Sequence, residues 1–318
     1  MSVLVYIESE NGLFKKSALE VASYGKAVAN SLQTSLCALV FNTKDASMLG
    51  TYGVSKVLSV ETTQPFTAEA YSKAIKQAVE RQQASVIILS NSANSKYLAP
   101  MLSSNLNAGY VPNVVEVPKT TSPFIVKRSV FSNKAFCSTE ITTDIKIIGL
   151  SNNAYGLKEQ PVEVDVEAFT PNDMTSKISI DGVEKNTDKI SIADADIVVS
   201  GGRGLKGPEN WGMIEELADV LGAATACSKP VSDLGWRPHS EHVGQTGKPV
   251  ATNLYIAIGI SGAIQHLAGV NSSKTKVVIN TDPEAPFFKA ADYGIVGDAF
   301  EVVPELIKKL QAFKAQNT

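Results

Sequence analysis

The sequence predicts an α/β protein with two domains, each built on a mainly parallel sheet with flanking helices. Two observations predict this class. Short apolar runs alternate with stretches of helical periodicity in both halves of the chain, which is typical of strand–helix–strand units. A polar stretch at 170–194, rich in Asp, Lys, Ser, Thr and Asn, separates the halves. We therefore expect an N-terminal domain at 1–169, a linker at 170–194 and a C-terminal domain at 195–318.

The first half of the chain alternates predicted strands and helices up to residue 106. The continuous apolar run at 85–89 is typical of a parallel strand that is covered on both faces. The predicted helices have apolar or small residues at intervals of three and four. The strands are expected at 2–7, 35–41, 56–60 and 85–89, and the helices at 16–32, 68–82 and 94–106.

Between 111 and 166 the runs become shorter and more polar, and apolar and polar residues alternate at 144–148. This pattern predicts an antiparallel or mixed extension of the same sheet. The second half then repeats the strand–helix alternation. Its strands are expected at 197–200, 222–227, 254–259, 276–280 and 293–296, and its helices at 209–221, from 262 to 267 and at 300–313.

Composition indicates a soluble globular protein, because 44% of the 318 residues are hydrophobic and 19% are charged. The formal charge of −3 gives no reason to expect a nucleic-acid partner. No apolar run approaches the roughly 20 residues that span a bilayer, so no membrane span is expected. The chain begins directly in a predicted strand, without a signal or transit peptide, which favours a cytoplasmic location.

Three glycine-rich segments, all in the second domain, are the candidate ligand-binding elements. Residues 200–204 lead from a strand into a helix, where backbone amides and the Arg203 guanidinium could meet an anion. A tight turn explains these glycines equally well. Residues 243–248 lack apolar periodicity, as binding loops often do, and 259–266 lead from a strand end into a helix start.

The cysteines, the histidines and the possible nucleophiles give no convincing metal site or catalytic site. Cys37, Cys137 and Cys227 are widely spaced and form no CxxC motif, so we expect structural thiols and no thiolate metal site. His239 and His242 have an H-x-x-H spacing, but no further metal ligands lie nearby in the sequence. No nucleophile with a matching base is evident, and we therefore expect no catalytic residues.

Five blocks of the second domain together resemble the α subunit of electron transfer flavoprotein. They occur in order and at matching spacing, which makes the resemblance specific. It is close over 197–318, whereas the first 165 residues agree only in general pattern. The blocks are residues 198–204, 243–247, 259–266, 280–286 and 291–296.

The resemblance implies a Rossmann-like C-terminal domain that holds FAD. Arg203 would lie close to the isoalloxazine, and Ser228, Gln245 and Thr246 would hydrogen-bond near the flavin ring. Residues 261–266 would contact the ribityl chain, the ring edge and the pyrophosphate. The full implied set is Arg203, Gly204, Ser228, Lys229, Val243, Gly244, Gln245, Thr246, Gly247, Ser261, Gly262, Ala263, Ile264, Gln265, His266, Asn280, Asp298 and Ala299, of which Asn280, Asp298 and Ala299 would hold the adenosine half.

The resemblance also implies a function and partners. A β subunit would complete a heterodimer, with the N-terminal domain as its main docking surface. The pair would carry electrons from acyl-CoA or related dehydrogenases, as in fatty acid β-oxidation, to a quinone oxidoreductase. A bifurcating complex that uses NADH, an enzyme that binds NAD and a purely structural module stay open as alternatives.

One residue departs from the family pattern. The family usually has Arg after the serine that matches Ser228, and this chain has Lys229. Both side chains are cationic, but Lys is a compact point charge without the planar fork of a guanidinium. We therefore expect charge stabilisation of a reduced flavin to survive, with an altered geometry.

Overall fold

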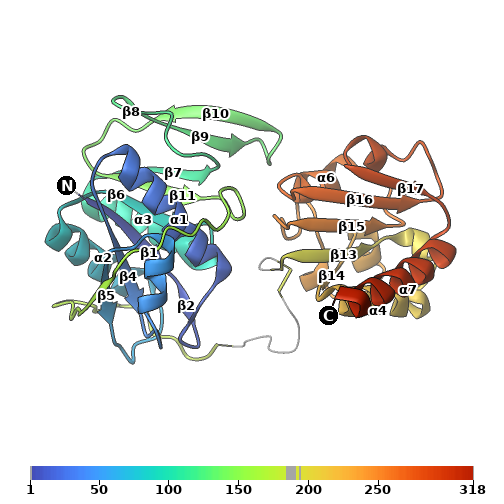
Figure 1. Cartoon of the computed structure of the whole chain (residues 1–318), viewed down its shortest axis with the longest axis horizontal. Helices are drawn as coiled ribbons and strands as arrows, with labels where there is room; N and C mark the ends of the chain where they lie inside the picture. The colour runs from blue at the N-terminus through green and yellow to red at the C-terminus, as the bar shows by residue number, and fades with distance from the viewer. Residues whose placement is uncertain (1, 184–190, 193–194, 318) are drawn as a thin grey trace. The chain divides into compact units, whose positions relative to one another are not determined.

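The computed structural model describes residues 2–183, 191–192 and 195–317. The chain forms two compact units that divide near residue 185 (Figure 1). The predicted linker at 170–194 lies partly outside the described residues, so its limits stay a prediction. No helix among the described residues is long and apolar enough to cross a membrane.

The first unit contains a ten-stranded sheet, ordered β10-β9-β7-β11-β6-β1-β4-β5-β12, with β8 paired to β9. A small hairpin, β2 (Ser9–Glu10) with β3 (Leu13–Phe14), and the 3-10 turn η1 (Ser47–Tyr52) accompany it. The strands of the main sheet are β1 Ser2–Ile7, β4 Ser35–Phe41, β5 Lys56–Val60, β6 Ala84–Ser90, β7 Gly109–Val114, β8 Thr120–Thr121, β9 Phe124–Val130, β10 Ala135–Glu140, β11 Lys146–Leu150 and β12 Asp165–Ala168.

Helices cover both faces of this sheet. Residues of α1 (Lys16–Ser31) pack in the cluster that buries one face, and those of α2 (Ala68–Gln82) and α3 (Ala93–Leu106) pack in the cluster on the other. The parallel core matches the sequence prediction, and β8, β9 and β10 form the predicted antiparallel extension. Strand β11 lies in the same extension, which is therefore mixed, as the sequence prediction allowed. It is a buried parallel strand between β7 and β6, because Ile147, Ile148 and Leu150 are all apolar and face the core.

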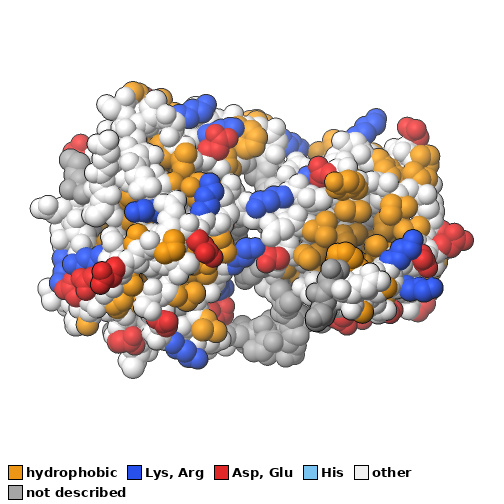
Figure 2. All heavy atoms as spheres, in the orientation of Figure 1, with side chains coloured by type: hydrophobic (Ala, Val, Ile, Leu, Met, Phe, Trp, Pro, Cys, Tyr) orange, Lys and Arg blue, Asp and Glu red, His pale blue; other side chains and the backbone are white. Residues whose placement is uncertain are grey.

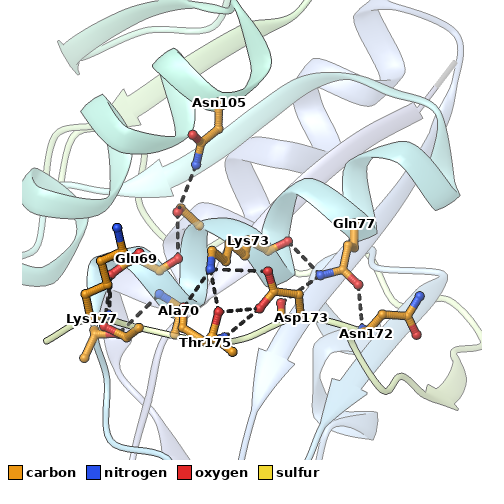
Figure 3. A network of polar contacts seen from close by, with 12 residues as sticks. Glu69, Ala70, Lys73, Gln77, Asn105, Asn172, Asp173, Thr175 and Lys177 are labelled. Atoms are coloured by element: carbon orange, nitrogen blue, oxygen red, sulfur yellow. Dashed lines mark hydrogen bonds and ion pairs between the residues drawn. The ribbon is translucent and has the colours of Figure 1, made fainter. Parts of the chain in front are cut away.

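The segment that follows β12 is fastened along α2 by polar contacts (Figure 3). The Lys73 ammonium pairs with Asp173 at 3.2 Å, and the Gln77 side chain accepts from the Asn172 amide at 2.6 Å. Further along, the Glu69 carboxylate accepts from the Lys177 amide at 2.8 Å. The first part of the predicted linker is therefore a surface arm of the first unit.

The second unit is a five-stranded parallel sheet, ordered β14-β13-β15-β16-β17. The chain starts in β13, moves to β14 on one side, and then crosses to β15 on the other side. The strand order therefore reverses between β13 and β15, and this reversal is the switch point at which doubly wound sheets bind ligands. The strands are β13 Ile197–Gly201, β14 Ala224–Cys227, β15 Leu254–Ile258, β16 Thr275–Asn280 and β17 Tyr293–Val296.

Helices α4 (Gly212–Leu221) and α7 (Ala299–Asn317) pack side by side on one face of this sheet (Figure 1). The short helix α6 (Ile264–Val270) contributes to the core on the other face. Helix α4 begins later than expected, because the 3-10 turn η3 (Pro208–Asn210) precedes it. Helix α5 (Lys229–Asp233) and the 3-10 turns η2 (Arg203–Leu205), η4 (His239–Glu241) and η5 (Pro286–Lys289) were not expected.

On the face that Figure 2 shows, basic and acidic side chains alternate over both units, without a large area of one sign. This mixture of signs on the visible face agrees with the formal charge of −3.

Candidate functional site

A cavity of about 520 Å³ lies at the carboxyl ends of β13, β14, β15 and β16. Its place at the switch point is the one that sheet topology predicts for a ligand, and its volume falls in the range of small-molecule sites. The cavity is lined by Arg203, Gly204, Ser228, Lys229, Pro230, His242, Val243, Gly244, Gln245, Thr246, Gly259, Ile260, Ser261, Ala263, Gln265, His266, Asn280, Asp282 and Ala285.

The glycines after β13 and β15 pack directly against each other at the switch point. A Cβ on Gly202 would lie 2.1 Å from the Gly259 carbonyl oxygen, and a Cβ on Gly204 would lie 2.7 Å from the Gly259 Cα. Gly259 itself has φ +64, a region that favours glycine. Any side chain at these positions would push the two turns apart and change the wall of the cavity.

The backbone amides of this turn are engaged within the protein. The Gly202 amide donates to the Ile258 carbonyl at 2.8 Å, and the Gly204 amide donates to the Gly259 carbonyl at 3.1 Å. The expectation that these glycines free their N–H groups for an anion is therefore wrong at both positions. Close packing of the two turns explains the glycines, and Arg203 is the group of this turn that reaches the cavity.

The loop around 243–248 is held between β14 and α6. The Val243 amide donates to the Cys227 carbonyl at 3.0 Å, and the Gln245 amide donates to the Gln265 carbonyl at 2.7 Å. A Cβ on Gly269 would lie 2.6 Å from the Gly244 Cα, so α6 can approach the loop only with a glycine there. These contacts present the exposed Gln245 and Thr246 at the cavity.

A buried ion pair anchors the segment that leads into this loop. The Arg237 guanidinium binds both carboxylate oxygens of Glu241, with distances of 2.8 and 2.7 Å. The same guanidinium contacts Glu215 on α4 at 3.2 Å and lies over the Trp211 ring at 5.2 Å. Glu241 is 7% exposed and immediately precedes His242, so this bidentate pair fixes where the loop enters the cavity wall.

Two buried imidazoles belong to the cavity wall. Nε2 of His266 lies 2.9 Å from the Tyr255 hydroxyl, and burial, followed by the charge of His242, lowers the pKa of His266 to about 4. Burial also lowers the pKa of His242, with His239 and Lys229 acting in the same direction. Both rings are therefore neutral at neutral pH. The Nδ1 atom of each is buried without a hydrogen-bond partner among the described residues.

Two cationic side chains and one anionic side chain line the cavity. Arg203 and Lys229 are exposed, and neither forms an ion pair with any residue that the structure describes. Asp282 is the acidic residue of the lining, so the formal balance is positive. Within the described part of the chain no group of three or more His, Cys, Asp or Glu could hold a metal ion.

The structure gathers most of the predicted site residues at this cavity and leaves five of them out of its lining. Asp298 instead accepts from the Phe300 amide at 3.0 Å, at the start of α7, and pairs with Lys206 at 3.7 Å. Asp298 and Ala299, which were predicted to hold the adenosine half of FAD, therefore do not line this cavity. The five predicted residues outside the lining are Gly247, Gly262, Ile264, Asp298 and Ala299.

Sequence reasoning also missed part of the lining. Gly259, Ile260, Asp282 and Ala285 were not in the implied set, although they belong to the segments 259–266 and 280–286 that the sequence singled out. His242 was weighed only as a metal ligand, although it directly precedes the 243–248 segment. Pro230 also lines the cavity, directly after Ser228 and Lys229, which the resemblance placed at the flavin.

The strand order, the cavity at the switch point and its positive lining define a doubly wound domain that binds an anionic nucleotide cofactor. The residues fit such a group, because two cationic side chains line the cavity and two buried imidazole nitrogens in its wall lack partners among the described residues.

The comparisons with known proteins name the family. Residues 191–271 match the family described as the electron transfer flavoprotein FAD-binding domain, and residues 3–174 match the electron transfer flavoprotein domain. Electron transfer flavoprotein subunit alpha from Bacillus subtilis is 35% identical, with 97% of each chain covered. Its counterpart from Thermoanaerobacterium thermosaccharolyticum is 34% identical over 98% of each chain. The mitochondrial subunit alpha of Arabidopsis thaliana is 31% identical over 98% of this chain and 90% of its own.

The chain belongs to the electron transfer flavoprotein subunit alpha family, and its cofactor is FAD. It is a redox carrier subunit by family. The resemblance seen in the sequence is thereby confirmed, including for the first half of the chain, which the blocks did not cover.

Proposed function

We propose that this chain pairs with an electron transfer flavoprotein β subunit and carries electrons from dehydrogenases, such as acyl-CoA dehydrogenases, to a quinone-reducing acceptor. The observation that best supports this proposal is the cavity at the switch point of the C-terminal sheet, because thirteen of the predicted FAD-binding residues line it. We also propose that the pair works in the cytoplasm.

FAD bound in this cavity would supply reversible uptake and release of electrons. The protein's part is to bind it, to place charges near it and to keep water out. Arg203 and Lys229 bring positive charge to the cavity, where it favours the reduced cofactor. Gln245 and Thr246 offer an amide and a hydroxyl on a loop that α6 and β14 hold in place, which suits hydrogen bonding to a flat heterocycle.

The neutral imidazoles of His242 and His266 complete the polar wall. Each can offer one N–H or one lone pair without adding charge, because burial lowers both pKa values. An unpaired buried nitrogen costs about 1–3 kcal/mol, and a ligand atom in the cavity would remove that cost. The same arrangement supplies no activated nucleophile, which supports a carrier over an enzyme that transforms a substrate.

The partner surface is proposed to lie mainly on the N-terminal domain. The hairpin of β9 and β10 exposes Phe131 and Phe136, which are 84% and 64% accessible in the isolated chain. The C-terminal domain also exposes apolar side chains on its edge strand β17, including Tyr293 and Val296. Exposed aromatic side chains at an unpaired sheet edge are suited to burial by a partner subunit.

The test is the absorption spectrum of the co-expressed α/β pair during reduction with dithionite. The proposal expects a flavin spectrum that bleaches on reduction and recovers with an electron acceptor. Reduction of the flavin by acyl-CoA dehydrogenase and its substrate, but not by NADH, would support the carrier. Rapid reduction by NADH alone would favour the bifurcating complex, and a colourless pair that binds NAD would favour the enzyme.

A further inference from the structure

The Arg237 guanidinium joins two separate segments of the C-terminal domain. It binds both carboxylate oxygens of Glu241 at 2.8 and 2.7 Å, and it contacts the Glu215 carboxylate at 3.2 Å. Glu241 is the last residue of η4, and Glu215 lies in the first turn of α4. The side chains of Arg237 and Glu241 are 16% and 10% exposed, so water competes little with their pairing. One guanidinium therefore ties the segment that enters the cavity loop to α4.

The Trp211 ring contacts both this guanidinium and the end of β13. Arg237 lies over the ring, with 5.2 Å between its Cζ and the ring centroid. A Cβ on Gly201 would lie 2.6 Å from Cζ3 of the same ring, so the ring packs directly against the last residue of β13. Trp211 is 4% exposed, and its Nε1 has no hydrogen-bond partner among the described residues. The place of the ring is therefore set by packing, and the guanidinium is part of that packing.

These contacts connect two loops that line the cavity. The Trp211 ring packs where β13 ends, two residues before Arg203. The ion pair ends directly before the loop that presents Gln245 and Thr246. Neither Arg237 nor Trp211 lines the cavity, so an effect of either side chain on a ligand must pass through these loops.

The backbone hydrogen bonds of the 243–248 loop tie it to other elements. The Val243 amide donates to Cys227 at the end of β14, and the Gln245 amide donates to Gln265 in α6. The Arg237 contacts instead tie the loop to α4 and, through the indole ring, to the end of β13. Loss of the guanidinium would leave the backbone bonds in place, so we expect the loop to shift rather than to unfold.

We propose that Arg237 is a positioning residue of the flavin site, which fixes the loop of Gln245 and Thr246 relative to the turn that carries Arg203. The inference rests on the proposed function, because it takes this cavity as the place of FAD. Groups that act on one ligand must be held within about 0.5 Å of the productive geometry. Hydrogen-bond donors gain strength as negative charge gathers on the flavin, so a shifted loop weakens binding of the reduced cofactor more than that of the oxidised one.

The test compares the unaltered α/β pair with Arg237→Lys. Lysine keeps the positive charge, but it lacks the planar fork that binds a carboxylate at two points and lies flat on an indole. Arg81→Lys is the matched control, because Arg81 also pairs with a glutamate, Glu167, and lies over an aromatic ring, that of Phe169, in the first unit. The dissociation constant and the two-electron potential of FAD are measured on the folded proteins.

We expect Arg237→Lys to raise the dissociation constant of oxidised FAD about two- to tenfold, as for the loss of one hydrogen bond. The constant for reduced FAD should rise by a larger factor, so the potential should fall. A threefold difference between the two factors corresponds to a fall of about 14 mV for a two-electron couple. Arg81→Lys should change neither the affinity nor the potential.

A double-mutant cycle locates the effect in the loop. Thr246→Val removes a hydroxyl from the loop that Arg237 holds, and Asn280→Ala removes an amide from β16, another element of the cavity wall. If Arg237 acts through the loop, Arg237→Lys should lose less FAD affinity in the Thr246→Val background than in the unaltered pair. In the Asn280→Ala background the loss should equal that in the unaltered pair.

Unchanged affinity and potential in Arg237→Lys would overturn the proposal, and so would equal losses of affinity in all three backgrounds. If Arg237→Lys fails to fold, the double variant Arg237→Gln with Glu241→Gln replaces the ion pair by two amides and leaves no buried charge unpaired, and the same shifts are expected. An unaltered pair without flavin would contradict the proposed function and this inference with it. A flavin-loaded pair that does not respond to Arg237→Lys would contradict this inference alone.

Discussion

Replacing Lys229 by Met should make the bound flavin harder to reduce. Lys229 is the first residue of α5 and lines the cavity, and Met keeps much of the stem volume while removing the charge. The charge already acts inside the cavity, because it contributes to the lowered pKa of the buried His242. A negative charge that develops in the same space would be stabilised by the same ammonium.

The size of the effect follows from the exposure of Lys229. An exposed ion pair contributes at most about 1 kcal/mol, and for a two-electron couple about 1.4 kcal/mol corresponds to about 30 mV. We therefore expect the potential of Lys229→Met to be lower by about 20 mV, and by up to about 40 mV if the partner subunit excludes water from the site. Lys229→Arg keeps the charge and should shift the potential by less.

The assay is spectroelectrochemistry of the α/β pair at one pH and one salt concentration. Lys248→Met is the matched control, because Lys248 is exposed on the neighbouring loop and does not line the cavity. The lost charge should also let the pKa of His242 rise, since Lys229 lowers it. Equal potentials for Lys, Arg and Met at position 229 would refute the reasoning and would indicate that Lys229 is a solvated surface residue with no effect on the flavin.

Three further predictions follow from the same structure. Arg203→Ala should lower the flavin potential and leave the free energy of unfolding nearly unchanged, because the side chain is exposed and forms no ion pair with a described residue. An unchanged potential would show that Arg203 does not act on the flavin. The folded pKa of His266, about 4, lies below its unfolded value of 6.5, so stability should be present above pH 6.5 and be lost as pH falls towards 4, by up to about 3 kcal/mol. Urea unfolding of the chain should show this loss, and His266→Gln should flatten it. Residues 1–169, expressed alone, should bind the β subunit and no nucleotide, and calorimetry that detects micromolar binding of ATP, AMP or NAD would contradict this.

The sequence predicted most of the fold because its signals were local. The apolar run of β6 and the periodicity of α2 each specify one element, and the structure has both within a residue of the predicted ends. The direction of strand β11 stayed open within the expected antiparallel or mixed extension, because its alternation at 144–148 is a short-range pattern, whereas its parallel pairing depends on the distant neighbours β6 and β7. Helix α5 has only five residues, too few for a periodic pattern.

The sequence predicted the site residues that lie in recognisable motifs near strand ends. It could not predict the contacts that depend on how separate turns and helices pack together. Ser261 follows the end of β15 and Asn280 is the last residue of β16, and the resemblance read from the sequence implied that both would contact FAD. The amides of Gly202 and Gly204 are used by the facing turn, which only the three-dimensional contact with Gly259 reveals. The link between Tyr255 and His266 also joins a strand to a separate helix, and no sequence spacing predicts it.

The most direct test of the account is the flavin content of the co-purified α/β pair, together with its loss when the wall of the cavity is displaced. The account predicts one FAD per pair, and loss of that FAD in Gly204→Val, where the new side chain would collide with the turn at Gly259. Gly212→Ala, at a glycine of α4 with open space around it and no positive φ, serves as the control for a glycine substitution in the same domain. A pair without flavin, or full FAD content in a folded Gly204→Val pair, would contradict the assignment of the cofactor to this cavity.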